Sequence, residues 1–271
     1  KLNLNYNITN IIINYFFIKL TTLLNGEILM WDTSKDYRIL IAQKSKELFI
    51  RTVQTGAFRG HWNKKMALES ANNMDADFQS LLYSYLEGEE LANSPDVDKL
   101  EEQAKYVIKY LGGEEWNHIF LNKAPKEERE KTEENIAKVQ FFLNTILGLR
   151  KRLSFGPIND PIIGIDIIVG EIMSVSKHPQ ADALMICNVN LKKRAITVVT
   201  NNLDVKEGNH VGVALLPPQT FMDIASEGMF LGVNGVVLKD VEGELGEMPK
   251  GIPMESLNDT RNLIEGFIQK K

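Results

Sequence analysis

The residues best suited to chemistry are cations that alternate with aromatic rings in the first half of the chain. Between residues 48 and 68 there is no acidic residue. Cations beside rings on a flexible connection can contact phosphates and stack on an unpaired base. The alternative is that Phe58 and its neighbouring tryptophan pack into a core while the cations stay solvated. The candidate residues of this stretch are Arg51, Arg59, Trp62, Lys64 and Lys65.

A second basic run, Arg150-Lys151-Arg152, stands at the end of a long predicted helix. Positive charge at that end either compensates the helix dipole or faces RNA. These three residues are therefore further candidates for RNA contact.

No pattern in the chain is typical of catalysis or of metal binding. The four histidines are scattered, and there is no glycine-rich phosphate loop or serine–histidine–acid arrangement. The single cysteine, Cys187, excludes an intrachain disulfide and fits a reducing, cytoplasmic interior. It lies in an apolar run, which favours a buried hydrophobic role. We expect no enzyme, no cofactor and no metal site.

Residues 30–155 carry the periodicity of a helical bundle, with apolar residues recurring every three or four positions. Separate helices are predicted for residues 62–73 and 75–91. Ser94-Pro95 predicts a helix start and Gly112 a helix end. Residues 156–164 contain Gly-Pro and Asp-Pro pairs and are predicted to be a linker.

The first 29 residues differ from the rest, because residues 1–30 hold six Asn and six Ile and almost no acid. The apolar run from residue 11 to 24 is shorter than the ~20 residues that a membrane span needs. Met30 is followed directly by a predicted helix start. We expect residues 1–29 to be translated upstream sequence or a dispensable leader, and no membrane association.

Short alternating apolar runs follow residue 165, and Gly, Asn and Pro interrupt them about every ten residues. This pattern predicts a small antiparallel β-barrel. His178-Pro179, followed by Ala181-Asp182, predicts the turn out of the first strand, with His178 as part of the turn architecture.

Two segments in this region match a known family. They are His178-Pro179-Gln180-Ala181-Asp182-Ala183-Leu184 and Ser226-Glu227-Gly228-Met229. Residues 165–268 resemble the tRNA-binding OB domain of the endothelial monocyte-activating polypeptide II type. That domain also occurs in methionyl-tRNA synthetase C-termini and phenylalanyl-tRNA synthetase β chains. The sequence departs from the family at Ala183, where a lysine is usual.

The resemblance implies RNA contact around the second segment and on basic residues of neighbouring strands. Ser226 would donate to a phosphate or sugar, Gly228 would allow close backbone approach, and Met229 would pack on a base. The alternative for the second segment is a purely structural turn. For Lys192, Lys193 and Arg194 it is a solvated hairpin tip, and for Asn201 and Asn202 it is a left-handed turn of the loop. The expected RNA-binding residues are Lys177, Lys192, Lys193, Arg194, Asn201, Asn202, Ser226, Gly228 and Met229.

The charge of the C-terminal region opposes this expectation. Residues 158–271 contain ten Lys and Arg against fifteen Asp and Glu, a formal charge of −5. RNA affinity comes largely from neutralised phosphates, although the distribution of charge matters more than its sum. We expect weaker and more salt-sensitive binding than in a basic relative.

Together these features predict a multidomain α and β protein: a helical bundle at residues 30–155 and an OB-fold β-barrel at residues 165–271. The expected function is non-catalytic binding of tRNA or another structured RNA. The helical half would add RNA contacts or dock an aminoacyl-tRNA synthetase, and a homodimer is compatible with the resemblance, because free-standing relatives often act as dimers. The alternative is a protein-assembly module whose acidic barrel has little RNA affinity.

Overall fold

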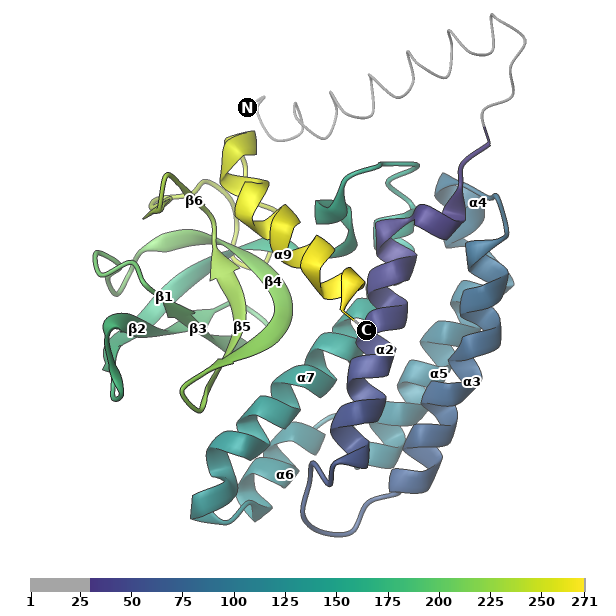
Figure 1. The fold of residues 1–271 in the computed structure, drawn as a ribbon, viewed down its shortest axis with the longest axis horizontal. Helices are drawn as coiled ribbons and strands as arrows, with labels where there is room; N and C mark the ends of the chain where they lie inside the picture. Colours follow the sequence, from purple (N-terminus) through teal and green to yellow (C-terminus); the bar gives the residue numbers. More distant parts are fainter. Residues whose placement is uncertain (1–29, 271) are drawn as a thin grey trace, which may run out of the picture. The chain divides into compact units, whose positions relative to one another are not determined.

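The structure is a computed structural model that describes residues 30–270 (Figure 1). The predicted leader at residues 1–29 lies outside the described residues. The described chain forms two compact units that meet at residues 164 and 165. They are called here the helical unit and the sheet unit. Within residues 30–270, none of the helices combines the length and the apolar character that crossing a membrane requires.

Helices build the first unit, as the periodicity predicted. Phe49 of α2 stacks on Phe142 of α7 with ring centroids 4.6 Å apart, inside a core that the longer helices share. The elements are η1 Thr33–Lys35, α2 Tyr37–Gln54, α3 Lys64–Leu82, α4 Gly88–Ala92, α5 Pro95–Leu111, α6 Trp116–Lys123, η2 Lys126–Glu128, α7 Arg129–Leu147, α8 Leu149–Leu153 and η3 Pro161–Gly164.

The predicted helix start at Ser94-Pro95 and the predicted end at Gly112 are confirmed. Ser94 is the N-cap of α5 and Gly112 its C-cap, with φ of 124° that favours glycine. The predicted break near residue 74 is wrong, because α3 is continuous there. Asp75 lies inside α3, where its carboxylate forms an ion pair with Lys46 of α2.

Antiparallel strands build the second unit, in the order β3-β2-β1-β4-β5 (Figure 1). The helix α9 packs beside β4. The elements are β1 Ile167–His178, β2 Ala181–Asn190, β3 Ala195–Thr200, β4 His210–Phe221, β5 Ile224–Phe230, β6 Gly232–Val233, β7 Val236–Val237, η4 Met254–Leu257 and α9 Asn258–Gln269.

The predicted turn out of the first strand is confirmed between β1 and β2. His178 is buried and stabilises two turns at once. Its Nδ1 accepts from the backbone N–H of Gln180 at 3.1 Å, so its Nε2 donates to the carbonyl of Phe221, 3.0 Å away at the end of β4. Met222 and Asp223 then reverse the chain into β5 with φ of 44° and 71°.

The two edge strands of the ladder, β3 and β5, contact each other. No backbone ladder pairs them in the described residues, so the sheet is not a closed barrel by its backbone hydrogen bonds. A helical region followed by an antiparallel sheet domain is thus what the structure contains. The sheet core consists of buried aliphatic side chains such as Val189, Val198 and Val213.

Candidate nucleic-acid interface

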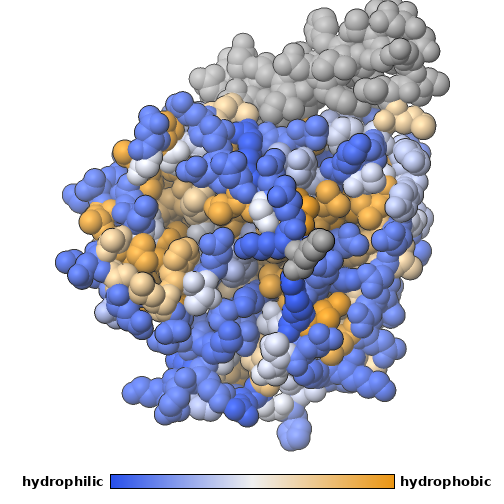
Figure 2. Space-filling model, viewed as in Figure 1, coloured by the Kyte–Doolittle hydropathy of each residue, from blue (hydrophilic) through white to orange (hydrophobic). Residues whose placement is uncertain are grey.

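The sheet unit presents three of its predicted cations to solvent. Lys177 is exposed on β1, and Lys192 and Lys193 are exposed in the turn between β2 and β3. Lys192 adopts φ of 71°, and its backbone N–H bonds to Oδ1 of Asn190 at 2.9 Å. Its only acidic neighbour among the described residues is the exposed Glu244 carboxylate, 3.9 Å from its Nζ. In residues 30–270, Lys177 and Lys193 have no carboxylate partner. Hydrophilic residues cover much of the surface of this unit around an apolar area (Figure 2).

Arg194 behaves differently from these lysines. Its guanidinium forms an ion pair with the carboxylate of Glu227 on β5, and both side chains are largely shielded from solvent. The pair therefore joins the start of β3 to β5, so that Arg194 carries less free positive charge than its neighbours.

Ser226 lies in the interior, with 4% of its surface exposed. Its Oγ accepts from the backbone N–H of Val199 on β3 at 3.0 Å and donates to the carbonyl of Gly228 at 2.9 Å. The donor that sequence reasoning assigned to a phosphate is thus directed at the protein itself. Ser226 links the two edge strands.

The close approach of the neighbouring strand β4 requires a glycine at position 228. A Cβ at this position would come within 2.6 Å of the carbonyl oxygen of Ala214 on β4. The close approach that was predicted toward RNA is an approach between β5 and β4 here. Met229 pairs with Ala214 and is half-buried.

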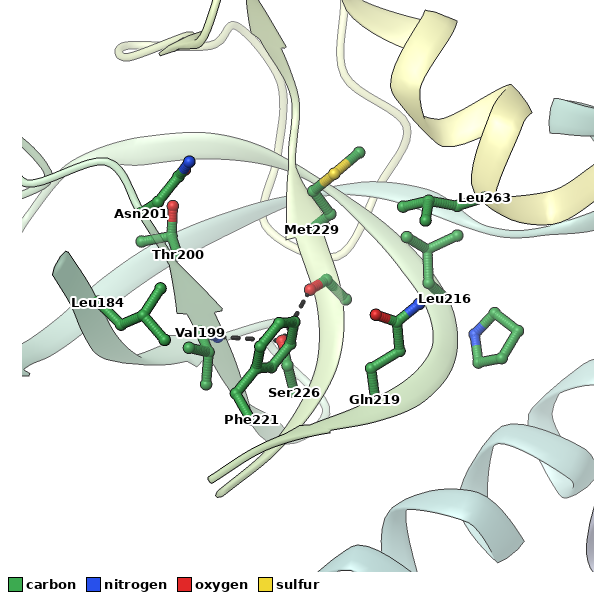
Figure 3. Close-up of a pocket in the computed structure, with 12 residues that line it drawn as sticks. Leu184, Val199, Thr200, Asn201, Leu216, Gln219, Phe221, Ser226, Met229 and Leu263 are labelled. Atoms are coloured by element: carbon green, nitrogen blue, oxygen red, sulfur yellow. Dashed lines mark hydrogen bonds between the residues drawn. The ribbon is translucent and has the colours of Figure 1, made fainter. Parts of the chain in front are cut away.

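The two asparagines after β3 have different surroundings. Asn202 is held in its loop, because its amide donates to Gly235 at 3.3 Å and its Oδ1 accepts from Asp204 at 3.1 Å. Asn201 is exposed at the rim of a cavity of about 290 Å³ (Figure 3). The structure therefore brings Asn201, Ser226, Gly228 and Met229 together around one hollow.

Eight lining residues of that cavity were not among the predicted site residues, and three of the eight, Thr200, Gln219 and Phe221, carry a polar group or an aromatic ring. Thr200 lies between the two family segments, and Gln219 and Phe221 precede the second segment without belonging to it, so no local motif marks them. The signal that was available is the Gln219 to Phe221 segment directly before the turn at Met222 and Asp223, which faces the β5 motif in an antiparallel pair.

In the helical unit, two residues of the basic run in α8, Arg150 and Arg152, bind other groups of the same unit. Arg150 pairs with Glu101 at 3.0 Å and with Asp98 at 2.5 Å, and it donates to the carbonyl of Ala92 at 2.9 Å. The hydrogen bond with Glu101 is the main cause of the raised pKa of Arg150. Arg152 is 2% exposed and donates to the carbonyl of Thr145. Lys151 is exposed.

Some residues of the acid-free stretch, residues 48–68, also bind other groups of the helical unit. Arg59 pairs with Glu128 at 2.5 Å, and this hydrogen bond raises the pKa of Arg59 and lowers the pKa of Glu128. Trp62 is half-buried and packs edge-on against Phe58 and Phe120 at centroid distances of 5.9 and 5.7 Å. The two rings offered for base stacking therefore belong to an aromatic cluster of the fold. Arg51 and Lys65 are exposed, and Lys64 is half-exposed.

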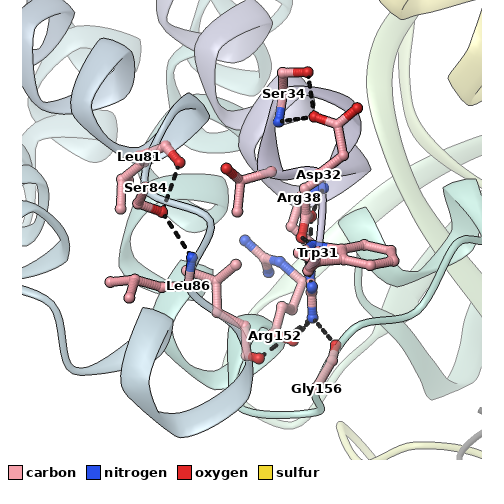
Figure 4. A network of polar contacts seen from close by, with 12 residues as sticks. Trp31, Asp32, Ser34, Arg38, Leu81, Ser84, Leu86, Arg152 and Gly156 are labelled. Atoms are coloured by element: carbon pink, nitrogen blue, oxygen red, sulfur yellow. Dashed lines mark hydrogen bonds and ion pairs between the residues drawn. The ribbon is translucent and has the colours of Figure 1, made fainter. Parts of the chain in front are cut away.

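Sequence reasoning also missed a buried ion pair between Arg38 and Asp36, which belongs to a polar network at the start of α2 (Figure 4). Arg38 and Asp36 are both 0% exposed, and Nη2 of Arg38 lies 2.5 Å from Oδ2 of Asp36. The Nη1 of Arg38 donates to the carbonyls of Arg152 and Gly156 at 2.9 and 2.7 Å. One guanidinium thus neutralises a buried carboxylate and satisfies carbonyls at the end of α8.

The described residues contain no group of three or more His, Cys, Asp or Glu side chains placed to hold a metal ion. Cys187 is buried in the sheet core, as predicted, and burial raises the pKa of its thiol to about 11.

Comparisons with known proteins identify the two units. Residues 167–255 match a family described as "Putative tRNA binding domain", and residues 30–156 match a family described as "Alpha helical domain". The predicted resemblance to the tRNA-binding domain, fused to an N-terminal helical domain, is confirmed.

Several relatives are phenylalanine–tRNA ligase beta subunits. The one from Moorella thermoacetica is 36% identical over 104 residues, which cover 32% of this chain and 13% of that subunit. The one from Acinetobacter baylyi is 29% identical over 121 residues, which cover 41% of this chain and 15% of that subunit. The chain therefore spans about one seventh of the length of these relatives. A solved structure described as a MetRS related protein from Pyrococcus horikoshii aligns at 23% identity with a TM-score of 0.28, over 31% of this chain and 88% of that one.

Proposed function

We propose that the chain is a non-catalytic, cytoplasmic tRNA-binding protein whose sheet unit grips tRNA by its shape and its phosphates. The observation that carries the proposal is the match of residues 167–255 to the tRNA-binding family. The same unit presents Lys177, Lys192 and Lys193 at its surface, where they can neutralise phosphates and release counterions.

The fold of the sheet unit is proposed to be an OB barrel. Its strand order and the contact between the edge strands support this, since an OB barrel is a partly open five-stranded barrel. Two side-chain links support it as well: Ser226 bonds to the backbone of Val199, and Arg194 pairs with Glu227. In this proposal both residues shape the binding face, and the lysines contact the phosphates.

The helical unit takes a secondary role in this proposal. Arg59, Arg150 and Arg152 serve its own fold. Of the candidate residues in this unit, the exposed Arg51, Lys65 and Lys151 and the half-exposed Lys64 remain for a phosphate or for an acidic partner such as a synthetase. Formation of a homodimer stays a prediction.

The charge of the C-terminal region favours one alternative. Residues 158–271 carry a formal charge of −5, and a uniformly acidic surface repels RNA. The alternative function is a protein-assembly module with little RNA affinity.

A filter-binding titration of the full chain against bulk tRNA at several salt concentrations separates the two functions. The tRNA-binding proposal predicts micromolar or tighter binding. The slope of log affinity against log salt should correspond to the release of several counterions. Lys193→Glu should weaken binding by about 1 kcal/mol or more, because it replaces a phosphate contact by a repulsion. The matched control is Lys250→Glu, an exposed lysine outside the candidate set.

The assembly alternative predicts no tRNA binding at low salt. If Lys193→Glu and Lys250→Glu weaken tRNA binding equally, the protein still binds tRNA but Lys193 is not part of the interface.

A further inference from the structure

The cavity beside Ser226 has walls from several strands of the sheet unit. Val199 and Thr200 of β3 line one side, and the last residues of β4 line the other (Figure 3). Leu263 of α9 and Leu184 of β2 also contribute. Its volume of about 290 Å³ lies just below the range of drug-sized ligand sites, about 300–1,000 Å³, and suits a small ligand.

The lining of the cavity contains no Asp, Glu, Lys or Arg side chain. A ligand that carries its own charge would be desolvated there without a partner, so the cavity suits a neutral group. Aliphatic side chains, Met229 and the ring of Phe221 supply apolar surface for a flat ligand.

Two uncharged amides stand at the rim. Asn201 lies on the β3 side and Gln219 on the β4 side, and both are exposed (Figure 3). Neither side-chain amide has a hydrogen-bond partner in the part of the chain that the structure describes. The hydroxyls nearby are engaged, since Ser226 is bonded to Val199 and Gly228, and Thr200 accepts from the N–H of Asn202.

We propose that this cavity takes one unpaired nucleobase of the bound RNA, with adenine preferred. This inference rests on the proposed tRNA binding and adds the chemistry of one subsite to it. A base is flat and neutral, its faces are apolar, and its edge carries donors and acceptors that an amide can satisfy. The phosphates of the same nucleotide stay outside the cavity, in solvent.

The preference for adenine follows from the side chains at the rim. An Asn or Gln amide forms two hydrogen bonds with the N6 and N7 atoms of adenine. Guanine is read by Arg or Lys and cytosine by Asp or Glu, and the cavity lining has none of these. One amide forms the bidentate pair, so the two positions are tested separately to find which of them holds the base.

The test uses the full chain and short single-stranded RNAs of equal length: oligoadenylate, oligocytidylate and oligouridylate. Fluorescence anisotropy should give at least fivefold tighter binding of oligoadenylate than of oligocytidylate. Gln219→Leu or Asn201→Leu should reduce that preference to less than twofold. The control Gln180→Leu changes an exposed amide in the turn between β1 and β2 and should leave the preference intact.

A second readout places the base in the cavity. The three tryptophans, Trp31, Trp62 and Trp116, all belong to the helical unit. The variant Phe221→Trp therefore gives the sheet unit its only indole, and stacking of adenine should quench it on titration with oligoadenylate.

The outcomes separate this inference from the proposed function. If wild-type protein binds tRNA but shows no base preference, or if neither amide variant changes the preference, the nucleobase subsite is overturned and tRNA binding stands. If wild-type protein binds no tRNA, the proposed function itself has failed. If the amide variants shift the oligomeric state instead of the preference, the cavity receives a second copy of the chain and the inference is wrong.

Discussion

The two units of this protein use their basic residues in opposite ways. In the helical unit, Arg38 and Arg152 are buried and Arg150 is bound to two carboxylates. In the sheet unit, Lys177 and Lys193 face solvent without a carboxylate partner among the described residues. The helical unit therefore uses these three arginines within its own fold, whereas Arg51 stays exposed.

The difference shows why net charge is a poor guide to a binding surface. Arginine presents several donors in a fixed plane and is suited to holding carbonyls and carboxylates inside a fold, whereas lysine is a flexible, strongly hydrated point charge. The acidic sheet unit can therefore still expose lysines, and its Arg194–Glu227 ion pair involves none of them. What matters for RNA is the set of cations left unpaired.

The largest expected effect concerns Arg38. The variant Arg38→Met leaves the buried carboxylate of Asp36 without its partner and should destabilise the helical unit by about 3–5 kcal/mol. Urea unfolding followed by tryptophan fluorescence measures this, since the three tryptophans lie in that unit.

The control for Arg38 lies on the same helix. Arg51→Met changes an exposed residue and should shift the stability by less than about 0.5 kcal/mol. The double variant Asp36→Leu with Arg38→Leu should lose less than Arg38→Met, because no unpaired charge remains. Equal stabilities of Arg38→Met and Arg51→Met would contradict the structural role of the buried pair.

A smaller effect is expected at the link between the edge strands. Ser226→Ala leaves the buried N–H of Val199 without an acceptor and should cost about 1–3 kcal/mol. Hydrogen exchange of the Val199 amide should speed up while the tryptophan signal of the helical unit stays unchanged. Ser174→Ala, on the exposed face of β1, is the matched control, and equal exchange in both variants would show that Ser226 is not a link.

The smallest effect is a change in pH response at an exposed ion pair. The hydrogen bond from Arg59 lowers the pKa of Glu128 in the folded state. The pair therefore adds stability above the ordinary pKa of glutamate and loses it as the pH falls through the folded-state value. In an NMR titration of the Glu128 carboxyl group, Arg59→Gln should move the midpoint upward. An unchanged midpoint would mean that the pair does not form in solution.

Much of the fold could be predicted from local patterns. Helical periodicity, Ser94-Pro95 and Gly112 marked helices and their ends, because capping and backbone geometry act within a few residues. The turn at His178 was predicted for the same reason. The break near residue 74 was predicted wrongly, because Ala71, Met74 and Phe78 continue the buried face of one helix across it.

The site was less predictable than the fold. The family segment identified Ser226, but its hydrogen bond to Val199 joins strands 27 positions apart and depends on the sheet order. Gln219 and Phe221 line the cavity only because β4 pairs with β5. The internal use of Arg150 likewise depends on how α5 and α8 pack. Spacing in the sequence does not encode such contacts.

The most direct test of the central claim compares the salt dependence of tRNA binding in two matched triple variants of the full chain. One changes Lys177, Lys192 and Lys193 to Gln, and the other changes Arg51, Lys65 and Lys151 to Gln, so both remove three exposed positive charges. If the sheet unit supplies the phosphate contacts, the first set lowers the slope of log affinity against log salt by roughly three, and the second leaves it unchanged. The opposite result, a reduced slope only for the helical set, would contradict this account.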